Sequence, residues 1–312
     1  MRPHRGSPDN RVSRPAQQSL GSGFVPHGAT AGGGFDLRLA PEDAGWGFSG
    51  LRVLALDAGG AHTLDTGEDE LIVLPLEGAC SVAVDGERFD LDGRDGVFAA
   101  LTDVVYAPRD ARVEIASEGG GRFALPSARA ATRRDPVHVA AGDIAVELRG
   151  AGTASRQINN FCGPDATYAD RLIAVEVLTP AGNWSSYPPH KHDEDVPGVE
   201  TALEEIYYFE LGASPTGTPG LAYQRVYGSG PGREIDVTAE VRSGDMVVMP
   251  HGYHGPSMAA PGYDLYYLNV MAGPGQRAWQ FTDDPAHAWI RATWDGQELD
   301  PRLPLTGVRR RA

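Results

Sequence analysis

The chain has 312 residues, enough for one large domain or two modest domains with substantial cores. Its formal net charge of −15 argues against a nucleic-acid partner, which needs a basic face, but allows a locally basic pocket for a small anionic substrate. The 40 glycines and 24 prolines favour short β elements separated by turns over long helices.

The cysteine count and the hydropathy of the chain bear on its compartment. Cys80 and Cys162 lack metal-ligand spacing, and so few cysteines are typical of a reducing environment. We interpret both as small buried hydrophobic residues rather than nucleophiles. No apolar run approaches the about 18 to 20 residues that a membrane span needs, and the first residues lack the apolar core of a signal peptide. We therefore expect a cytoplasmic protein with no membrane partner.

The first half of the chain is predicted to form one β barrel. Residues 1–32, rich in Arg, Ser, Pro and Gly, are expected to be a disordered tail. The segment 33–130 then contains short runs rich in β-branched residues, with Gly, Pro and Asp between them. Within it, Asp85-Gly86 predicts a hairpin turn. The predicted strands are 51–56, 69–78, 80–91, 103–108 and 112–117.

A second β series occupies residues 131–295, and residues 296–312 are expected to be a C-terminal tail. The two halves resemble each other: DELIVLPLEG in the first corresponds to LEEIYYFELG in the second, and TDVVYAP corresponds to GDMVVMP. We therefore predict an all-β fold of two tandem antiparallel barrels of the jelly-roll type, with short helical connections. The predicted strands of the second barrel are 171–180, 204–211, 220–228, 233–238, 245–250 and 263–273.

The stretch SSYPPHKHDEDVPGVETALEEIYYFE (185–210) contains candidate metal ligands. Residues i and i+2 of a strand point to the same face, so His190 and His192 present two imidazoles together. Alternation sends Glu204 and Glu205 to opposite faces, and only one of them can join the histidines. We choose Glu205, because it shares its face with large aromatic residues. The acidic residues between these groups form a surface loop, or a lid over the barrel mouth.

His254 completes the candidate set, because it follows a predicted strand and a glycine turn in SGDMVVMPHGYHGP (243–256). Three imidazoles and one carboxylate that leave coordination positions open suit one divalent transition metal ion per chain, such as Zn, Mn, Fe or Ni. The first barrel has only His62 and Glu70 at the corresponding positions. We therefore predict that the first barrel is structural and lacks a complete metal site.

This arrangement resembles the cupin superfamily, whose two motifs are G-x5-H-x-H-x3,4-E-x6-G and G-x5-P-x-G-x2-H-x3-N. The sequence departs from the first motif, because twelve residues separate His192 from Glu205. It departs from the second, because one residue lies between Gly252 and His254 and the final Asn is missing. His251 is therefore a rival ligand.

Longer stretches resemble the bacterial 5-deoxy-glucuronate isomerase family of myo-inositol catabolism, over about residues 33–295. The resemblance implies a bicupin fold and the aldose–ketose isomerisation of 5-deoxy-D-glucuronate to 5-dehydro-2-deoxy-D-gluconate. The matching stretches are NWSSYPPHKHD (183–193), LEEIYYFE (203–210), YQRVYG (223–228) and GYHGPSMAAPGYDLYYLNVMAGP (252–274).

Such a reaction needs a Lewis acid, a group that moves a proton and a cation for the substrate carboxylate. The candidate catalytic residues are Glu205, Glu176 and Tyr253. Arginine is the natural bidentate partner of a carboxylate. The candidate substrate-binding residues are Arg171 and Arg225, on predicted strands of the second barrel, and Tyr187, beside the proposed ligands.

Three alternatives remain at the level of sequence: a related isomerase of the 5-keto-4-deoxyuronate type, an Fe(II) cupin dioxygenase, and a sugar-binding cupin without turnover. Oxygen consumption on addition of substrate would distinguish a dioxygenase from an isomerase. In each case the expected partner is a small anionic sugar acid. The sequence is also compatible with a homo-oligomer.

Overall fold

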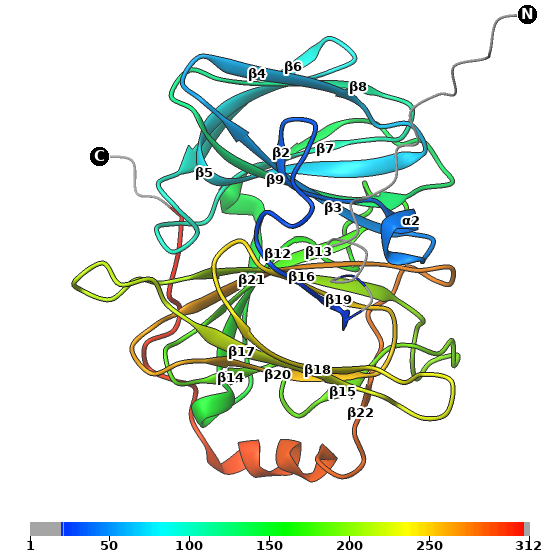
Figure 1. Cartoon of the computed structure of the whole chain (residues 1–312), viewed down its shortest axis with the longest axis vertical. Coiled ribbons are helices and arrows are strands. Elements are labelled where there is room, and N and C mark those ends of the chain that lie inside the picture. Colours follow the sequence, from blue (N-terminus) through cyan, green and yellow to red (C-terminus); the bar gives the residue numbers. More distant parts are fainter. Residues whose placement is uncertain (1–19, 21, 309–312) are drawn as a thin grey trace, which may run out of the picture.

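The computed structural model describes residues 20 and 22–308, which form two antiparallel β barrels. The barrels lie one above the other in Figure 1, with the N-terminal barrel in blue and cyan and the C-terminal barrel mainly in green, yellow and orange. Helices in these residues are short, namely α2 (Pro41–Ala44), η1 (Ala141–Asp143), η2 (Gly152–Ala154) and η3 (Ala288–Gly296). The prediction of an all-β fold with two tandem barrels is confirmed.

The N-terminal barrel is held together by one long strand, β5 (Asp69–Val84), which belongs to both of its walls. The first part of β5 pairs with β7 and β9, and its last part pairs with β6 and β8. Gly78 lies where the register shifts, with a φ of 87°, and a Cβ there would lie 2.4 Å from the carbonyl oxygen of Gly120. The other strands are β2 (Phe35–Leu39), β3 (Ser49–Leu56), β4 (Gly60–Asp65), β6 (Glu87–Arg94), β7 (Val104–Ala107), β8 (Arg112–Ser117), β9 (Gly121–Arg129) and β10 (Val137–Val139).

The C-terminal barrel consists of two facing sheets. The sheet next to the N-terminal barrel has the order β1-β19-β16-β21-β13-β12-β11, and the outer sheet has the order β18-β17-β20-β15-β22, with β14 paired to β20. The strands are β1 (Phe24–Val25), β11 (Ala145–Arg149), β12 (Arg156–Cys162), β13 (Ile173–Thr179), β14 (Trp184–Ser185), β15 (His190–Lys191), β16 (Glu204–Leu211), β17 (Ala222–Tyr227), β18 (Asp236–Val241), β19 (Met246–Met249), β20 (Tyr253–Ala259), β21 (Leu265–Ala272) and β22 (Thr282–Asp283).

The inner sheet of the C-terminal barrel buries both of its faces. One face packs against the N-terminal barrel in a shared core that includes Leu51 and Ile72 from that barrel and Ile206 and Tyr208 from β16. The opposite face of β16 enters the interior of the C-terminal barrel with Tyr207. Since successive side chains of a strand point to opposite faces, neighbouring residues of β16 lie alternately in the core between the barrels and in the interior of the C-terminal barrel. This alternation decides which polar residues can reach the candidate site.

Three of the predicted domain limits need correction. Residues 24–25 form β1 and pair with β19, so this part of the predicted disordered tail is ordered, whereas residues 1–19 lie outside the described part of the chain. The predicted boundary at 131 is too early, because β10 pairs with β7 and extends the N-terminal barrel to Val139. In the predicted C-terminal tail, Thr306 is buried and bonds to Gln157 of β12. Segments that the sequence analysis assigned to tails or to different domains are therefore hydrogen-bonded to each other in the structure.

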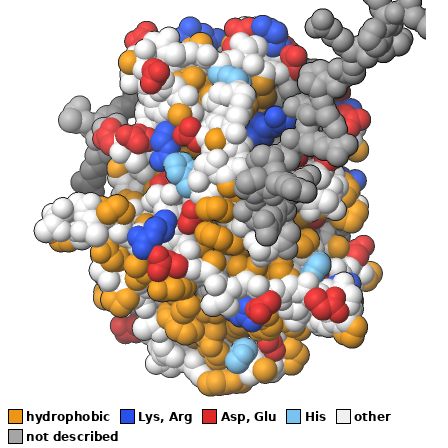
Figure 2. Space-filling model, in the orientation of Figure 1, with side chains coloured by type: hydrophobic (Ala, Val, Ile, Leu, Met, Phe, Trp, Pro, Cys, Tyr) orange, Lys and Arg blue, Asp and Glu red, His pale blue; other side chains and the backbone are white. Residues whose placement is uncertain are grey.

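The surface agrees with the expectation drawn from the net charge. On the face shown in Figure 2, acidic and basic side chains are interspersed among the described residues of both barrels, without a continuous basic surface. Within the part of the chain that the structure describes, no helix has the length and apolar character needed to cross a bilayer.

Candidate metal centre

Four predicted ligands meet inside the C-terminal barrel, and each reaches it from a different point of the backbone. His190, on β15, is paired directly with His254, on β20. His192 follows β15 by one residue and shares the inward direction of His190. Glu205 lies near the start of β16, on the face that also carries Tyr207. All four residues are buried, with exposed fractions of 7% or less.

The polar atoms of His192, Glu205 and His254 lie within 4.8 Å of one another. The Oε2 atom of Glu205 is 3.1 Å from Nε2 of His192 and 2.9 Å from Nε2 of His254. His190 lies beside this group, with its ring centroid 4.4 Å from that of His254. Its Nδ1 is 3.4 Å from the carbonyl oxygen of Pro188, so Nε2 is the ring nitrogen left for a ligand.

The protonation states of Glu205 and His190 suit a cation, whereas the Glu205 carboxylate outweighs the effect of burial on His192 and raises the pKa of that imidazole. Burial favours the neutral form of Glu205, but His254 and His192 outweigh it and hold the pKa of this carboxyl well below its usual range. Burial, reinforced by the neighbouring imidazoles, lowers the pKa of His190, which is therefore neutral at pH 7. A carboxylate anion and neutral imidazole are the forms that bind a metal ion.

One atom of the cluster also lacks a hydrogen-bond partner among the described residues. It is Oε1 of Glu205, which is shielded from solvent; Nε2 of His254 is buried as well and has only its 2.9 Å contact with Oε2 of the same carboxylate. Buried polar atoms are otherwise nearly always paired, and a bound ion is one of the standard explanations for an exception. The donor set of imidazoles and one carboxylate therefore fits a divalent transition metal ion.

The acidic loop, residues 193–200, is fastened beside this centre by Lys191. Lys191 points away from the histidines, as strand alternation requires, and its Nζ donates to Asp193, Glu194 and Glu200 at 2.7–2.9 Å. Asp193 also accepts a hydrogen bond from the backbone N–H of Gly252, near the turn that leads to His254. The three carboxylates surround an ammonium group, so this acidic cluster is an ion-pair network that orders the insertion between His192 and Glu205.

The catalytic candidate Glu176 lies on the face of β13 that is turned away from the candidate metal centre. Its neighbours Val175 and Val177 enter the interior of the C-terminal barrel, so Glu176 points into the core between the barrels. There it pairs with the fully buried Arg94 and accepts a hydrogen bond from Tyr266. The prediction that Glu176 acts on substrate is therefore corrected: its role is to join the two barrels.

Tyr253 and Arg225 also point away from the centre, for the same reason. Tyr253 precedes the inward-facing His254 on β20, and its ring lies 5.6 Å from that of Tyr227 on the outer surface. Arg225 precedes the buried Val226 on β17 and forms a surface ion pair with Asp236. Neither side chain shares a face with the candidate ligands.

The remaining predicted residues have other partners. Arg171 donates to the carbonyl oxygens of Pro274 and Gly275, and so ties a loop to the start of β13. The ring of Tyr187 packs edge-on against Trp184, with the centroids 5.2 Å apart. The structure therefore does not bring Arg171 or Tyr187 into the cluster of ligand atoms.

The rival ligand His251 is partly exposed and lies outside the cluster. Its Nε2 atom is 3.4 Å from the backbone carbonyl oxygen of Glu234. Between Pro250 and Tyr253 the chain turns through Gly252, whose φ is 94°, and this turn directs His254 inward. The geometry therefore favours His254 over His251.

Sequence reasoning overlooked a group of hydroxyls in the barrel interior. Tyr207 and Tyr267 stack with their centroids 4.4 Å apart, and both hydroxyls hydrogen bond to Oγ of Ser186, at 2.8 and 3.1 Å. The ring of Tyr207 lies 6.1 Å from that of His254. The signal was present for Tyr207, which shares its strand face with Glu205, but aromatic residues are so common in strands that packing was the simpler interpretation.

The N-terminal barrel offers a different environment. Its interior is filled by apolar side chains such as Val73, Val82 and Ile115. Glu70 accepts hydrogen bonds from the backbone N–H groups of Asp170, Arg171 and Leu172, and His62 packs against Phe35. The two candidate ligands of this half therefore have separate structural roles.

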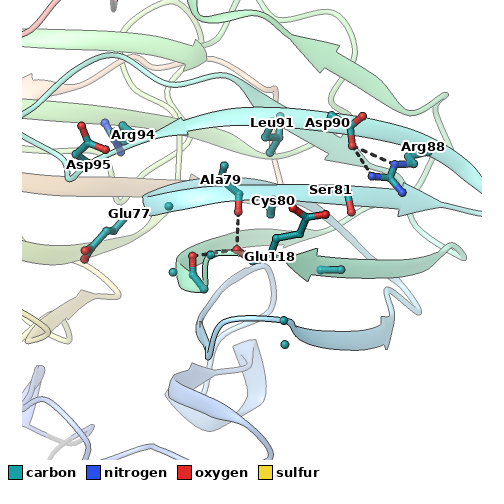
Figure 3. A pocket seen from close by; sticks show the side chains of 18 residues that line it. Glu77, Ala79, Cys80, Ser81, Arg88, Asp90, Leu91, Arg94, Asp95 and Glu118 are labelled. Carbon is teal, nitrogen blue, oxygen red and sulfur yellow. Dashed lines mark hydrogen bonds and ion pairs between the residues drawn. The ribbon is translucent and has the colours of Figure 1, made fainter.

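A cavity of about 710 Å³ lies at the edge of the N-terminal barrel. Figure 3 shows the side chains that line it. Of its arginines, Arg88 bonds to Asp90 in the figure, and Arg94 is engaged by Glu176. Burial raises the pKa of the Cys80 thiol in its wall to about 12, so this cysteine is not a thiolate at neutral pH. The groups in this cavity do not form a constellation comparable to the one in the C-terminal barrel.

Two β barrels in tandem, with imidazoles and a carboxylate converging inside the second, define a bicupin with a candidate metal centre. Known structures share this architecture. Bacillus subtilis oxalate decarboxylase, a protein with Mn(II) centres, matches with a TM-score of 0.53 and 12% identity, covering 79% of this chain and 74% of the other. At this identity the likeness concerns the fold alone.

The chain belongs to the KduI/IolB family, whose model matches residues 24–290. A 5-deoxy-glucuronate isomerase of Geobacillus thermodenitrificans is 40% identical over 256 residues, covering 81% of this chain and 90% of the relative. The 5-deoxy-glucuronate isomerase of Bacillus subtilis strain 168 is 39% identical, covering 77% and 86%. The crystal structure of an IolB-like protein from Salmonella typhimurium LT2 has a TM-score of 0.78 and 34% identity, covering 86% and 98%.

Proposed function

We propose that this protein is a metal-dependent aldose–ketose isomerase that converts 5-deoxy-D-glucuronate to 5-dehydro-2-deoxy-D-gluconate in myo-inositol catabolism. Membership of the KduI/IolB family and the relatives named 5-deoxy-glucuronate isomerase support this reaction. The observation that carries it in the structure is the buried group of His192, Glu205 and His254, with one carboxylate oxygen of Glu205 left without a partner.

The metal would be held by His190, His192, Glu205 and His254, as one divalent ion per chain. A bound ion of this kind supplies a Lewis acid that polarises a carbonyl and its neighbouring hydroxyl. The protein supplies a dry enclosure for this chemistry, because the four ligands and Tyr207 are almost completely buried. Exclusion of water strengthens the electrostatic interactions within such a site.

The polar groups beside the centre are suited to bind and orient hydroxyls. Burial, together with the charge of Glu205, raises the pKa of Tyr207 well above its usual range, so its phenol stays protonated and can donate. Ser186 links this phenol to that of Tyr267. Of the three proposed catalytic carboxyl and phenol groups, Glu205 is the one that shares this interior face, and its low pKa suits a metal ligand better than a proton acceptor at neutral pH.

The decisive experiment is incubation of the metal-loaded protein with 5-deoxy-D-glucuronate and identification of the product by NMR. Formation of 5-dehydro-2-deoxy-D-gluconate, a 5-keto acid, without oxygen consumption is the expected result. A parallel incubation with 5-keto-4-deoxyuronate tests the related isomerase, and an oxygen electrode tests the dioxygenase. Turnover of only the second substrate, or uptake of oxygen in proportion to product, would replace the proposed reaction with one of these alternatives.

A further inference from the structure

Arg156 is a buried arginine at the wall of the C-terminal barrel. It opens β12 and lies two residues before Ile158, which packs in the barrel interior opposite Val177 of β13. Residues i and i+2 of a strand point to the same face, so Arg156 is directed into this interior as well. Its exposed fraction of 5% agrees with that placement.

Arg156 has no carboxylate partner in the part of the chain that the structure describes. The one hydrogen bond of its side chain to these residues runs from Nη1 to the carbonyl oxygen of Ala154, at 3.1 Å. Arg94, the comparable buried arginine of the other barrel, pairs with Glu176. A buried guanidinium is destabilising unless an anion lies beside it. Arg94 has such an anion in Glu176, whereas Arg156 has none among the described residues.

Neighbouring charges increase the need for an anion at Arg156. Burial lowers the pKa of this guanidinium to about 10, and the positive charges of Arg149 and Arg291 act in the same direction. Arg149 already pairs with Glu147, and Arg291 with Asp283. Arg156 nevertheless remains charged at neutral pH, so the barrel holds a positive charge that its own acidic residues leave uncompensated.

The surroundings of Arg156 connect it to the candidate metal centre. Ile158, on the same face as Arg156, is opposite Val177, and Val177 is paired with Tyr267. Tyr267 stacks on Tyr207, whose ring lies 6.1 Å from that of His254. Thr179 and Asn269 face the same interior, and their Oγ1 and Oδ1 atoms are buried without a hydrogen-bond partner among the described residues. Polar groups without protein partners thus accompany the unpaired charge.

We propose that Arg156 binds the carboxylate of the substrate, while the carbonyl end of the same molecule lies at His192, Glu205 and His254. The two ends of a uronic acid are chemically distinct, which suits an interior that offers a guanidinium at one place and metal ligands at another. The identity of the substrate rests on the proposed function. The preference for an anion follows from the unpaired guanidinium itself. Arg156 replaces Arg171 and Arg225 in the role that the sequence gave to those arginines.

Calorimetric titration of the full-length protein tests this inference independently of turnover. The probes are D-glucuronate and D-glucose, which differ by the carboxylate. The wild-type protein should bind D-glucuronate more tightly, and Arg156→Met should lose about 30-fold in affinity for it, as expected when one partner of a buried charge pair is removed. Affinity for D-glucose should not change. Arg225→Met removes a surface arginine of the same barrel and should behave as the wild type.

Two further readouts distinguish a ligand-binding role from a structural one. The melting temperature of ligand-free Arg156→Met should equal or exceed that of the wild type, because the substitution removes an unpaired buried charge. Arg156→Lys keeps the charge but loses the two-pronged geometry, so its KM should rise by about 5-fold or more with a smaller change in kcat. If the Met variant does not fold, the KM of the Lys variant decides: an unchanged KM rejects the inference.

The outcomes separate this inference from the proposed function. A wild-type protein without preference for D-glucuronate, or an Arg156→Met variant that keeps the preference, overturns the role of Arg156. If the wild type isomerises 5-deoxy-glucuronate and Arg156→Met retains its KM, the reaction stands and the inference fails. If the wild type does not isomerise that substrate but binds D-glucuronate through Arg156, the anion site stands and the proposed reaction fails.

Discussion

Glu204 and Glu205 are adjacent on β16, but their side chains point to opposite faces of the sheet and have different partners. Glu205 enters the C-terminal barrel and lies against His192 and His254. Glu204 points to the other barrel, where its carboxylate accepts hydrogen bonds from the backbone N–H groups of Gly47, Phe48 and Ser49. Substitution of each residue is therefore expected to have a different effect.

Glu205→Gln should release the metal, because it removes the only anion of the proposed ligand set, and the affinity should fall by about 10-fold or more. Glu204→Gln should keep the metal but lower the free energy of unfolding by about 1–3 kcal/mol, since a charged acceptor of three N–H groups is weakened. Metal analysis and urea denaturation measure the two effects. Metal loss in Glu204→Gln with retention in Glu205→Gln would contradict the assignment.

The pair His254 and His251 provides a second test at the scale of single residues. His254→Ala should yield folded, metal-poor protein with little activity, because one proposed ligand is lost from an otherwise intact core; a loss of affinity of about 10-fold or more is expected. His251→Ala should retain its metal and most of its activity, since that side chain is partly exposed and contacts a backbone carbonyl. The opposite pattern would make His251 the ligand.

At the scale of elements, the sequence predicted eleven of the 22 strands that the described residues form, and several of those it missed lack a strong apolar pattern. β11 and β12 went unrecognised, and with them Arg156, because ELRG and RQINN carry too many polar residues to be read as buried strands. β1 and β22 are two-residue strands defined only by their partners. Local pattern cannot reveal an element whose existence depends on tertiary pairing.

The face of a strand was predictable only where one residue fixed the register. On β16 the large aromatic residues on one face selected Glu205, and the structure places Glu205 on the side of the histidines. On β13 no such marker exists: Ile173–Thr179 is buried on both faces, so Glu176 could have pointed either way. Continuous burial removes the alternation that would otherwise indicate the core side of a sheet.

The acidic loop is the element whose order depends most on a single side chain. Lys191→Met would leave Asp193, Glu194 and Glu200 close together without their shared cation. We expect the loop to lose about 1–3 kcal/mol of local stability and to be cleaved by protease about 5-fold faster or more. Limited proteolysis with mass spectrometry measures this change.

Arg233→Met is the control for that experiment. Arg233 pairs with Glu194 at 3.0 Å from the more exposed side, and such solvent-screened pairs contribute little to stability. Cleavage within 193–200 should therefore change little in this variant. Equal protection in wild type and Lys191→Met would show that the loop is held by its backbone contacts alone.

At the scale of the whole molecule, the inner sheet of the C-terminal barrel joins the two barrels through one face and builds the candidate site on the other. Arg94–Glu176 and Arg122–Glu210 are ion pairs that cross between the barrels on the first face. The second face carries Glu205 and the stacked tyrosines. The N-terminal barrel can thus support the geometry of the site without contributing a metal ligand.

Because the candidate ligands lie only in the C-terminal barrel among the described residues, we predict one transition metal ion per chain, bound in that barrel. Three apolar cores, one within each barrel and one between them, hold the backbone independently of the ion. A chelator should therefore remove the metal and abolish activity while the far-ultraviolet circular dichroism stays unchanged, unlike small zinc domains that unfold without metal. His62→Ala, in the N-terminal barrel, should leave the metal content at one. Two ions per chain, or metal loss in His62→Ala, would mean that the first barrel also binds metal, and collapse of the spectrum on chelation would mean that the ion, rather than the shared core, holds the two barrels in register.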